Sequence, residues 1–505
     1  MNRLSIVEKL INTLNDNSIN YCHWKSNEHV HDAFTGVDDI DLLISEDHIT
    51  KLNVVLNNIG YKRFNLPEKR KYYGIEDYIA YDDKEGIFVH LHLHYNLTLG
   101  EKFLKGYQLP YSNKILENRI YDRTNNIFIS SYEDEMWLLI IRSALKIRNR
   151  DKFKNLLNKP VINKGTKIEF EWLKKRIENE KLITVLPKDL SIKSQKIIID
   201  IANKELNNSK LTALNKNLIK DFRYFKANNR LKSKYLKWSR EIFRINQIIN
   251  KKILRSPKAY RRSPISGGKV ISLLGPDGAG KSTLMFNLEK SLSKQFDTEK
   301  IYLGSGDGNS SLLRLPLKIL YSFFLKRKII DRKSKKINKD GSFNYTQETK
   351  KSSILRQIGE APWIAVLTSE KISKLKKTWK LKNNGYIVLT DRYPQDQIIG
   401  MLDGPRFYKN DQIKSNFIND QIVNHEKKLY DLSNKLNPDL IIVLTVSSEV
   451  AMSRKPEEIS LESHKNLMHK LLSLKFENSK VVYIDANQDI DEVRKNVMKE
   501  VWDIL

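Results

Sequence analysis

The clearest signal in this 505-residue sequence is the stretch LLGPDGAGKST, residues 273 to 283. The apolar run VISLL (270 to 274) leads into it, and Leu284, Leu288 and Leu292 follow at helical spacing. Together these patterns predict a short strand, a glycine-rich turn and then a helix.

The glycine-rich turn has the spacing of a phosphate-binding loop, through Gly275, Gly280, Lys281 and Ser282. Glycines let backbone N–H groups curl around phosphate oxygens, and the N-terminus of the following helix adds its dipole. Lys281 would reach the outer phosphates, and the Ser282 hydroxyl would complete the shell of a Mg²⁺ ion. The sequence therefore predicts ATP as cofactor, held by residues Gly275, Asp277, Gly278, Gly280, Lys281, Ser282 and Thr283.

Asp391 and Arg392 follow the predicted strand YIVLT (386 to 390). The carboxyl ends of parallel strands face the ligand crevice, where a carboxylate holds a metal and an arginine grips a phosphate. An ordinary surface ion pair is the alternative for these two residues. Further strands at 437 to 446 and 480 to 486, alternating with helices, predict a doubly wound α/β domain with a parallel sheet.

The segment from about 268 to 505 resembles the thymidylate kinases and their P-loop relatives. The resemblance is carried, in order, by GPDGAGKST, DRYP, PDLIIVLTVSSEVAMSRKPEE and YIDANQDIDEV. It implies that Asp277 and Arg392 contact the phosphate acceptor, and that Arg454 belongs to a lid over ATP. It also implies transfer of the ATP γ-phosphate with Mg²⁺, with Lys281, Asp391, Arg392 and Arg454 as the catalytic residues.

Three departures from that family bear on the acceptor. The Arg-Glu-Pro-Gly-Gly stretch is replaced by IYLGSGDGNSSLLRLP (301 to 316), and Lys371 stands where an arginine is usual. Leu367 occupies the place of an aromatic ring that stacks on thymine. Lysine still pairs with a phosphate as a point charge, so Lys371 is expected to bind the acceptor. We therefore expect a small anionic acceptor other than dTMP, and the insert from 326 to 351 exceeds what a compact kinase needs.

The N-terminal stretch GVDDIDLLISEDH (36 to 48) places Asp39 and Asp41 two residues apart on a predicted strand. Both carboxylates would face one side and could hold one Mg²⁺ ion. Residues 1 to 130 resemble the nucleotidyltransferase fold, which implies a third carboxylate on a later strand. His92 stands at that place, so only two evident acids remain; a strand end in a degenerate domain is the alternative for the Asp pair.

The run HLHLH puts His90, His92 and His94 on one face of a strand. Such side chains are either metal ligands or simply hydrogen-bonded histidines of a half-buried strand. Lys25, in HWKS, faces either an anionic substrate or solvent.

The net charge is +29, and the positive excess is concentrated between residues 131 and 268. This part is expected to be helical, and the basic helix predicted over 230 to 262 would contact an anionic surface or pack between domains with a solvated lysine face. The single cysteine, the charged apolar run at 312 to 325 and the absence of a signal-peptide pattern predict a cytoplasmic protein without a transmembrane segment.

The sequence thus predicts three parts: an α+β nucleotidyltransferase-like domain (1 to 130), a basic helical region (131 to 262) and a thymidylate kinase-like P-loop domain (263 to 505). The expected activity is that of an ATP-dependent phosphotransferase. Two alternatives remain: an NTP-operated scaffold at a membrane or assembly, and a nucleotidyltransferase that uses the P-loop domain as a sensor.

Overall fold

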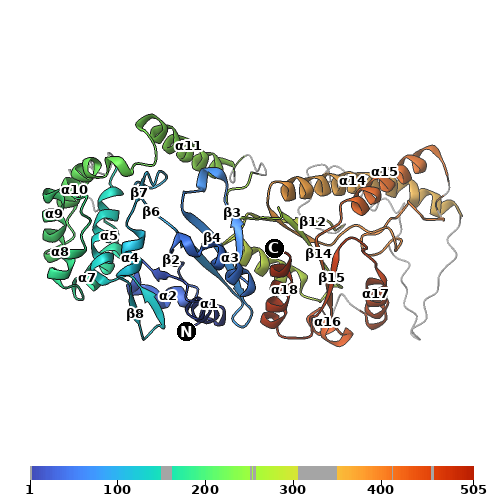
Figure 1. Cartoon of the computed structure of the whole chain (residues 1–505). Coiled ribbons are helices and arrows are strands. Elements are labelled where there is room, and N and C mark those ends of the chain that lie inside the picture. Colours follow the sequence, from blue (N-terminus) through green and yellow to red (C-terminus); the bar gives the residue numbers. More distant parts are fainter. Residues whose placement is uncertain are drawn as a thin grey trace. The chain divides into compact units, whose positions relative to one another are not determined.

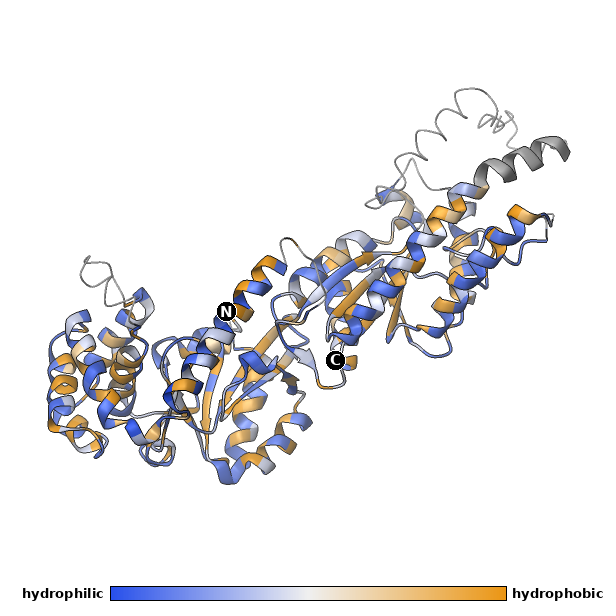
Figure 2. Cartoon of the chain, turned by 90° about the horizontal axis from the view of Figure 1, so that it is seen from above, coloured by the Kyte–Doolittle hydropathy of each residue, from blue (hydrophilic) through white to orange (hydrophobic). Residues whose placement is uncertain are grey.

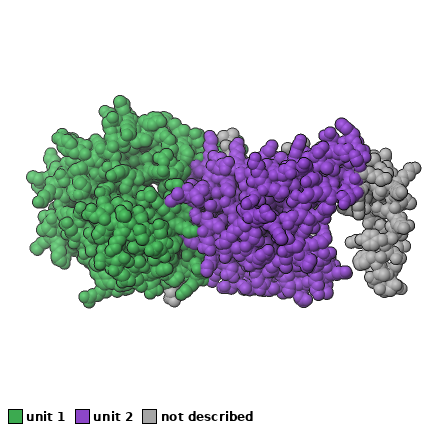
Figure 3. All heavy atoms as spheres, turned by 45° about the vertical axis from the view of Figure 1, so that its right-hand side comes forward, with its two compact units in different colours: residues 1–256 green, residues 257–505 purple. Residues whose placement is uncertain are grey.

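The computed structural model describes residues 3–148, 162–250, 253, 258–304, 350–411, 413, 415–455 and 460–505. The chain forms two compact units, Met1–Ser256 and Pro257–Leu505 (Figure 3). The apolar run from 312 to 325 and almost all of the insert from 326 to 351 lie outside the described residues.

Pro257–Leu505 is built on a five-stranded parallel sheet with the order β12-β13-β11-β14-β15 (Figure 1). The strands predicted from the apolar runs are therefore confirmed, and the first of them, next to the glycine-rich loop, lies at the centre of the sheet. The strands are β11 (Lys269–Leu274), β12 (Thr298–Tyr302), β13 (Ile387–Asp391), β14 (Leu440–Thr445) and β15 (Lys480–Asp485), and a short β10 (Ser263–Pro264) precedes them.

Helices cover the sheet of this unit because its strands carry apolar side chains on both faces of the sheet. Val270, Val388 and Ile441 share a buried cluster with Leu375 and Leu429, which come from two helices that pack together, α14 and α15. Helices α12 and α18 also pack together, against the other strand residues. The helices are α12 (Lys281–Leu292), α14 (Lys350–Asn383), α15 (Phe417–Lys435), α16 (Ser448–Arg454), α17 (Leu461–Ser473) and α18 (Ile490–Ile504).

Met1–Ser256 contains a mixed sheet in which the strands of this unit follow the order β3-β4-β5-β2-β1-β9-β8. Strands β2 and β5 are parallel neighbours, and β4 lies antiparallel on the other side of β5. The strands are β1 (Tyr21–His23), β2 (Ile40–Ile44), β3 (Lys62–Asn65), β4 (Ile75–Asp82), β5 (Ile87–His94), β8 (Ile120–Asp122) and β9 (Ile127–Ile129), with a separate hairpin of β6 (Leu97–Leu99) and β7 (Tyr107–Leu109).

The helices of this unit complete two buried clusters, one under α1 and one around α5. Helices make up most of the described residues between 131 and 249, but the basic helix expected over 230 to 262 ends at Ile249, and residues 258 to 262 form no helix. The helices are α1 (Ser5–Asp16), α2 (Val30–Phe34), α3 (Ile49–Asn58), α4 (Ser112–Glu117), α5 (Tyr132–Leu145), α7 (Lys164–Lys174), α8 (Asn179–Val185), α9 (Ile192–Asn203), α10 (Asn208–Asp221) and α11 (Arg230–Ile249).

Hydrophobic residues follow the strands and alternate with polar residues along the helices (Figure 2). Within the described part of the chain, no helix combines the length and the apolar character that a membrane span requires.

Candidate functional site

The loop between β11 and α12 has a backbone that depends on glycine. Gly278 has φ +83° and Gly280 has φ +81°, a region that L-residues rarely adopt. A Cβ atom at Gly278 would also lie 2.8 Å from the Ala451 carbonyl oxygen. The loop therefore turns tightly into α12, with Gly280 as the N-cap of that helix.

Lys281 is folded back onto this loop. Its side chain is 8% exposed, and its Nζ donates hydrogen bonds to the carbonyl oxygens of Gly275 (2.9 Å) and Pro276 (2.7 Å). Burial lowers the pKa of its ammonium, and the Asp277 carboxylate, 3.7 Å away, opposes that shift. Ser282 and Thr283, in the first turn of α12, are exposed. A buried cation and exposed hydroxyls at a helix N-terminus suit phosphate oxygens.

Asp391 ends β13 beside this loop, because it is aligned with Leu273 of β11. Burial raises the pKa of its carboxyl group, and the positive charge of Lys281 opposes that shift. Its Oδ1 atom is buried without a hydrogen-bond partner among the described residues. Such an oxygen costs free energy unless something binds it, so Asp391 and the Ser282 hydroxyl fit a Mg²⁺ ion.

Arg392 connects the loop to a second acidic residue. Its Nη2 lies 3.4 Å from Asp277 Oδ1, and its Nη1 lies 3.6 Å from Asp403 Oδ2. Asp403 also pairs with Lys371 at 3.0 Å, and both of these side chains are buried. Arg392 has φ +68°, the kind of strained backbone that recurs at functional sites. Sequence reasoning missed Asp403, whose segment MLDGPRF carries no motif.

Arg454, at the end of α16, joins the same site. Its guanidinium donates to the carbonyl oxygens of Gly278 (3.3 Å) and Ala486 (3.1 Å). The structure therefore gathers the predicted residues of this half around one loop, although Lys371 reaches it only through Asp403.

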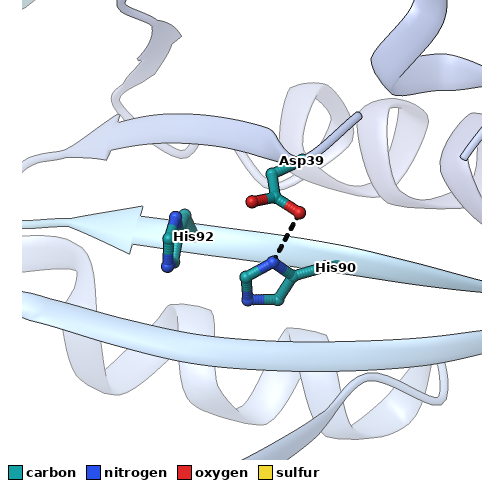
Figure 4. A group of neighbouring side chains, drawn as sticks. All are labelled: Asp39, His90 and His92. Atoms are coloured by element: carbon teal, nitrogen blue, oxygen red, sulfur yellow. Dashed lines mark hydrogen bonds and ion pairs between the residues drawn. The ribbon is translucent and has the colours of Figure 1, made fainter. Parts of the chain in front are cut away.

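A second cluster lies in Met1–Ser256, where β2 and β5 run side by side. Asp41 is aligned with His92, and Asp39 directly precedes β2 instead of lying in it. His90 Nδ1 lies 2.7 Å from Asp39 Oδ1 (Figure 4), and His94 Nε2 lies 3.2 Å from Asp41 Oδ1. Two groups, Asp39–His90–His92 and Asp41–His92–His94, each bring their ligand atoms within 4.8 Å of one another.

A third carboxylate enters this cluster from β4. Asp77 Oδ1 lies 2.7 Å from His90 Nε2 and 3.3 Å from His92 Nε2. The expectation that only Asp39 and Asp41 supply acid here is therefore wrong. Asp77 interrupts the buried face of a strand, and that polar residue in an apolar pattern was the available sequence signal.

The charges of this cluster are balanced within the unit. Burial opposes ionisation of Asp41, but Lys25, 2.9 Å away, and the hydrogen bonds from His92 and His94 outweigh it and hold the pKa well below its usual range. Burial also lowers the pKa of His94 to about 3, so this imidazole is neutral near pH 7. Burial also acts to lower the pKa of His92, but its hydrogen bonds to Asp41 and Asp77 outweigh burial and raise that pKa above its usual value. His92 therefore has to lose a proton before it binds a metal, whereas His94 is already in the neutral form that does.

The basic helix α11 is used on one side by its own unit. Arg240 donates to the carbonyl oxygens of Phe103 (3.0 Å), Leu104 (3.2 Å) and Lys71 (2.8 Å). Its other side exposes apolar residues, which are Leu231, Tyr235, Trp238, Ile242, Ile245 and Ile249. Contact of 230 to 262 with an anionic surface stays a prediction.

Comparison with known proteins identifies relatives of the C-terminal half of the chain. No protein-family model matches the chain. The "Uncharacterized ATP-binding protein YghR" of Escherichia coli K12 is 31% identical over 241 residues, 46% of this chain and 86% of that protein. "Uncharacterized ATP-binding protein YghS" of the same organism is 26% identical over 241 residues, 46% of this chain and 92% of that protein.

Solved structures also match over this half of the chain, among them two kinases. Thymidylate kinase from Candida albicans is 19% identical, covers 46% of this chain and 91% of that chain, and has a TM-score of 0.26. Deoxyadenosine kinase from M. mycoides is 18% identical, covers 46% of this chain and 98% of that chain, and has a TM-score of 0.25. The fold of this half is defined by the strand order described above. Through its C-terminal half, the chain belongs to the family of the Escherichia coli proteins YghR and YghS.

Proposed function

We propose that Pro257–Leu505 is an ATP-dependent phosphotransferase. The observation that carries the proposal is that two features lie at the same glycine loop: the buried ammonium of Lys281, and the Oδ1 atom of Asp391, which has no hydrogen-bond partner among the described residues. In the described part of the chain, the ammonium of Lys281 donates to two carbonyl oxygens and has only the exposed Asp277 carboxylate, 3.7 Å away, as an ion-pair partner. ATP binding by the related proteins, as their names state it, supports the same assignment.

The proposed reaction is an in-line displacement at the γ-phosphorus of ATP. An acceptor oxygen forms a bond to that phosphorus while the bond to the β,γ-bridging oxygen breaks, which releases ADP. Lys281 would leave its two carbonyl partners and follow the charge on the outer phosphates, and Arg454 would bind the phosphates from the Gly278 side. A Mg²⁺ ion held by Ser282 and Asp391 would supply further positive charge to the phosphates.

The acceptor would lie against Asp277 and Arg392. Arg392 is one-third exposed, so part of its guanidinium is free of Asp277 and Asp403 to pair with an anionic group. Leu367 is buried and offers no ring for a pyrimidine to stack on. We therefore propose a small phosphorylated acceptor other than dTMP.

The deciding experiment is a screen of purified full-length chain with ATP and Mg²⁺ against nucleoside monophosphates and sugar phosphates. Radiolabelled γ-phosphate should appear on at least one acceptor, and turnover should fall strongly in Asp391→Asn. Slow ATP hydrolysis that no acceptor accelerates would instead favour the NTP-operated scaffold.

We propose a second site for the Asp39, Asp41 and Asp77 cluster, namely binding of a divalent cation. The groups Asp39–His90–His92 and Asp41–His92–His94 favour it, because each brings three ligand atoms within 4.8 Å of one another. Asp77 would orient His90 and His92 through its contacts with their Nε2 atoms. Imidazole ligands shift the preference from Mg²⁺, predicted from the Asp pair alone, toward a transition ion such as Zn²⁺ or Mn²⁺. Calorimetric titration of the Lys281→Ala chain with each ion tests this.

His92→Ala should abolish that binding, whereas His31→Ala, which changes an exposed histidine of the same unit, should not. Incubation of the Lys281→Ala chain with each NTP tests nucleotidyl transfer by Met1–Ser256, which we expect to be slow or absent. Rapid pyrophosphate release that disappears in Asp39→Asn would make nucleotidyl transfer the main chemistry.

A further inference from the structure

Met1–Ser256 contains a cavity of about 140 Å³ that shares His94 with the Asp–His cluster, which consists of Asp39, Asp41, Asp77, His90, His92 and His94. One water needs only roughly 10–15 Å³ on this scale, so the cavity has room for a small chemical group. It is lined by Trp24, Lys25, His94, Thr98, Leu99, Gly100, Lys105, Arg142 and Lys146. Four of these side chains are cationic and none is acidic.

The positive charge around the cavity is only partly neutralised. Lys25 pairs with Asp41 (2.9 Å), and Arg142 pairs with Glu169 (2.6 Å). Lys105 and Lys146 form no ion pair with any described residue. Burial, and next the charge of Lys25, lowers the pKa of Lys105 to about 8. Neighbouring cations that lower one another's pKa in this way favour the binding of an anion between them.

Trp24, which borders the cavity, also carries an unused donor. It is 2% exposed, and its Nε1, which can only donate, has no hydrogen-bond partner among the residues described. A buried donor of this kind normally finds an acceptor, so a ligand is expected to supply one.

The loop that carries Lys105 is held in a costly conformation. Phe103 has φ +78° and Lys105 has φ +45°, in the left-handed region. The loop is tied to α11 by the Arg240 hydrogen bonds to Phe103 and Leu104, and by an ion pair between Lys237 and Glu101. Strain held by outside contacts is typical of a preorganised binding loop.

We propose that this cavity binds the phosphate group of a small molecule. Lys105, Lys146, Lys25 and Arg142 would surround the phosphate, and the Trp24 indole N–H would donate to one of its oxygens. Because His94 borders both the cavity and the Asp–His cluster, the phosphate would lie beside the cation site proposed there. The proposal concerns a ligand site in Met1–Ser256 and does not depend on the phosphotransferase activity.

The test uses full-length chain with Lys281→Ala, which weakens phosphate binding at the glycine loop. Inorganic phosphate, pyrophosphate and a sugar phosphate are titrated by calorimetry into this chain and into versions that also carry Lys105→Gln or Lys146→Gln. The matched control is Lys102→Gln, which removes the same charge from an exposed residue of the same loop.

At least one of the three probes should bind, and Lys105→Gln and Lys146→Gln should each weaken it about tenfold or more, as expected for a hydrogen bond to a charged group. Lys102→Gln should leave its affinity within about twofold. Tighter binding of the sugar phosphate than of inorganic phosphate would identify an organic ligand, and the reverse a free anion.

Two outcomes would overturn the proposal. One is the absence of binding of all three probes to the Lys281→Ala chain. The other is an equal loss of affinity in Lys102→Gln and Lys105→Gln, which would reveal general attraction to a basic surface.

Discussion

Replacing Lys281 by alanine tests the phosphate loop most directly. In the structure its ammonium is buried and donates to two carbonyl oxygens of the loop. Loss of a preorganised cation from a transferring phosphoryl group costs about 2.7–4 kcal/mol in the transition state, or about 10²- to 10³-fold in rate. We therefore expect γ-phosphate transfer to the best acceptor to fall by that factor in Lys281→Ala.

The same substitution should affect folding much less. Two hydrogen bonds are lost, each with a net value of about 0.5–1.5 kcal/mol, and burial of an ammonium is relieved at the same time. Urea denaturation should therefore show a loss of less than about 3 kcal/mol. The control is Lys290→Ala, which removes an exposed lysine from the same helix and should leave both rate and stability unchanged. Turnover at the wild-type rate in Lys281→Ala, with the control also unaffected, would refute the assignment of the loop.

Three further predictions concern the acceptor, the buried ion pair and the cationic cavity. Leu367 cannot stack on a base, and such stacking is worth about 1–3 kcal/mol on nucleic-acid platforms. In steady-state assays dTMP should therefore be a poor acceptor. A preference for dTMP over all other acceptors would contradict this. Asp403→Asn should destabilise Pro257–Leu505 by about 3–5 kcal/mol in urea denaturation, because it leaves Lys371 buried without its counter-charge. The control Asp411→Asn, at an exposed residue, should have no effect. An unchanged midpoint for Asp403→Asn would show that stability does not depend on this ion pair. The pKa of Lys105, whose ammonium is influenced by Lys25, Asp41, Asp77 and Lys146, is about 8 in the ligand-free protein. The contribution of Lys105 to phosphate affinity should therefore be nearly full at pH 7 and mostly lost at pH 9, where the affinity should be about five- to tenfold lower. The ratio of wild-type to Lys105→Gln affinity isolates this titration from that of the ligand, and a ratio independent of pH would contradict it.

The sequence alone was sufficient for the features that depend on local pattern. The strand, glycine loop and helix around residues 270 to 292 could be predicted because apolar periodicity and the backbone freedom of glycine are properties of neighbouring residues. The placement of Asp391 and Arg392 also followed, because carboxyl ends of parallel strands meet at one edge of a sheet. The alternation of His90, His92 and His94 likewise follows from the two-residue period of a strand.

Tertiary structure decided the features that depend on distant segments. Asp77 joins Asp39 and Asp41 because β4 pairs with β5, and no local pattern specifies that partner. Asp403 comes between Lys371 and Arg392 from an irregular loop, where sequence has no period to follow. The cationic cavity draws Lys25, Lys105 and Arg142 from widely separated segments. In the sequence, Asp77, Asp403, Lys105 and Arg142 look like ordinary surface charges, because burial and the resulting electrostatic coupling arise only when the chain is folded.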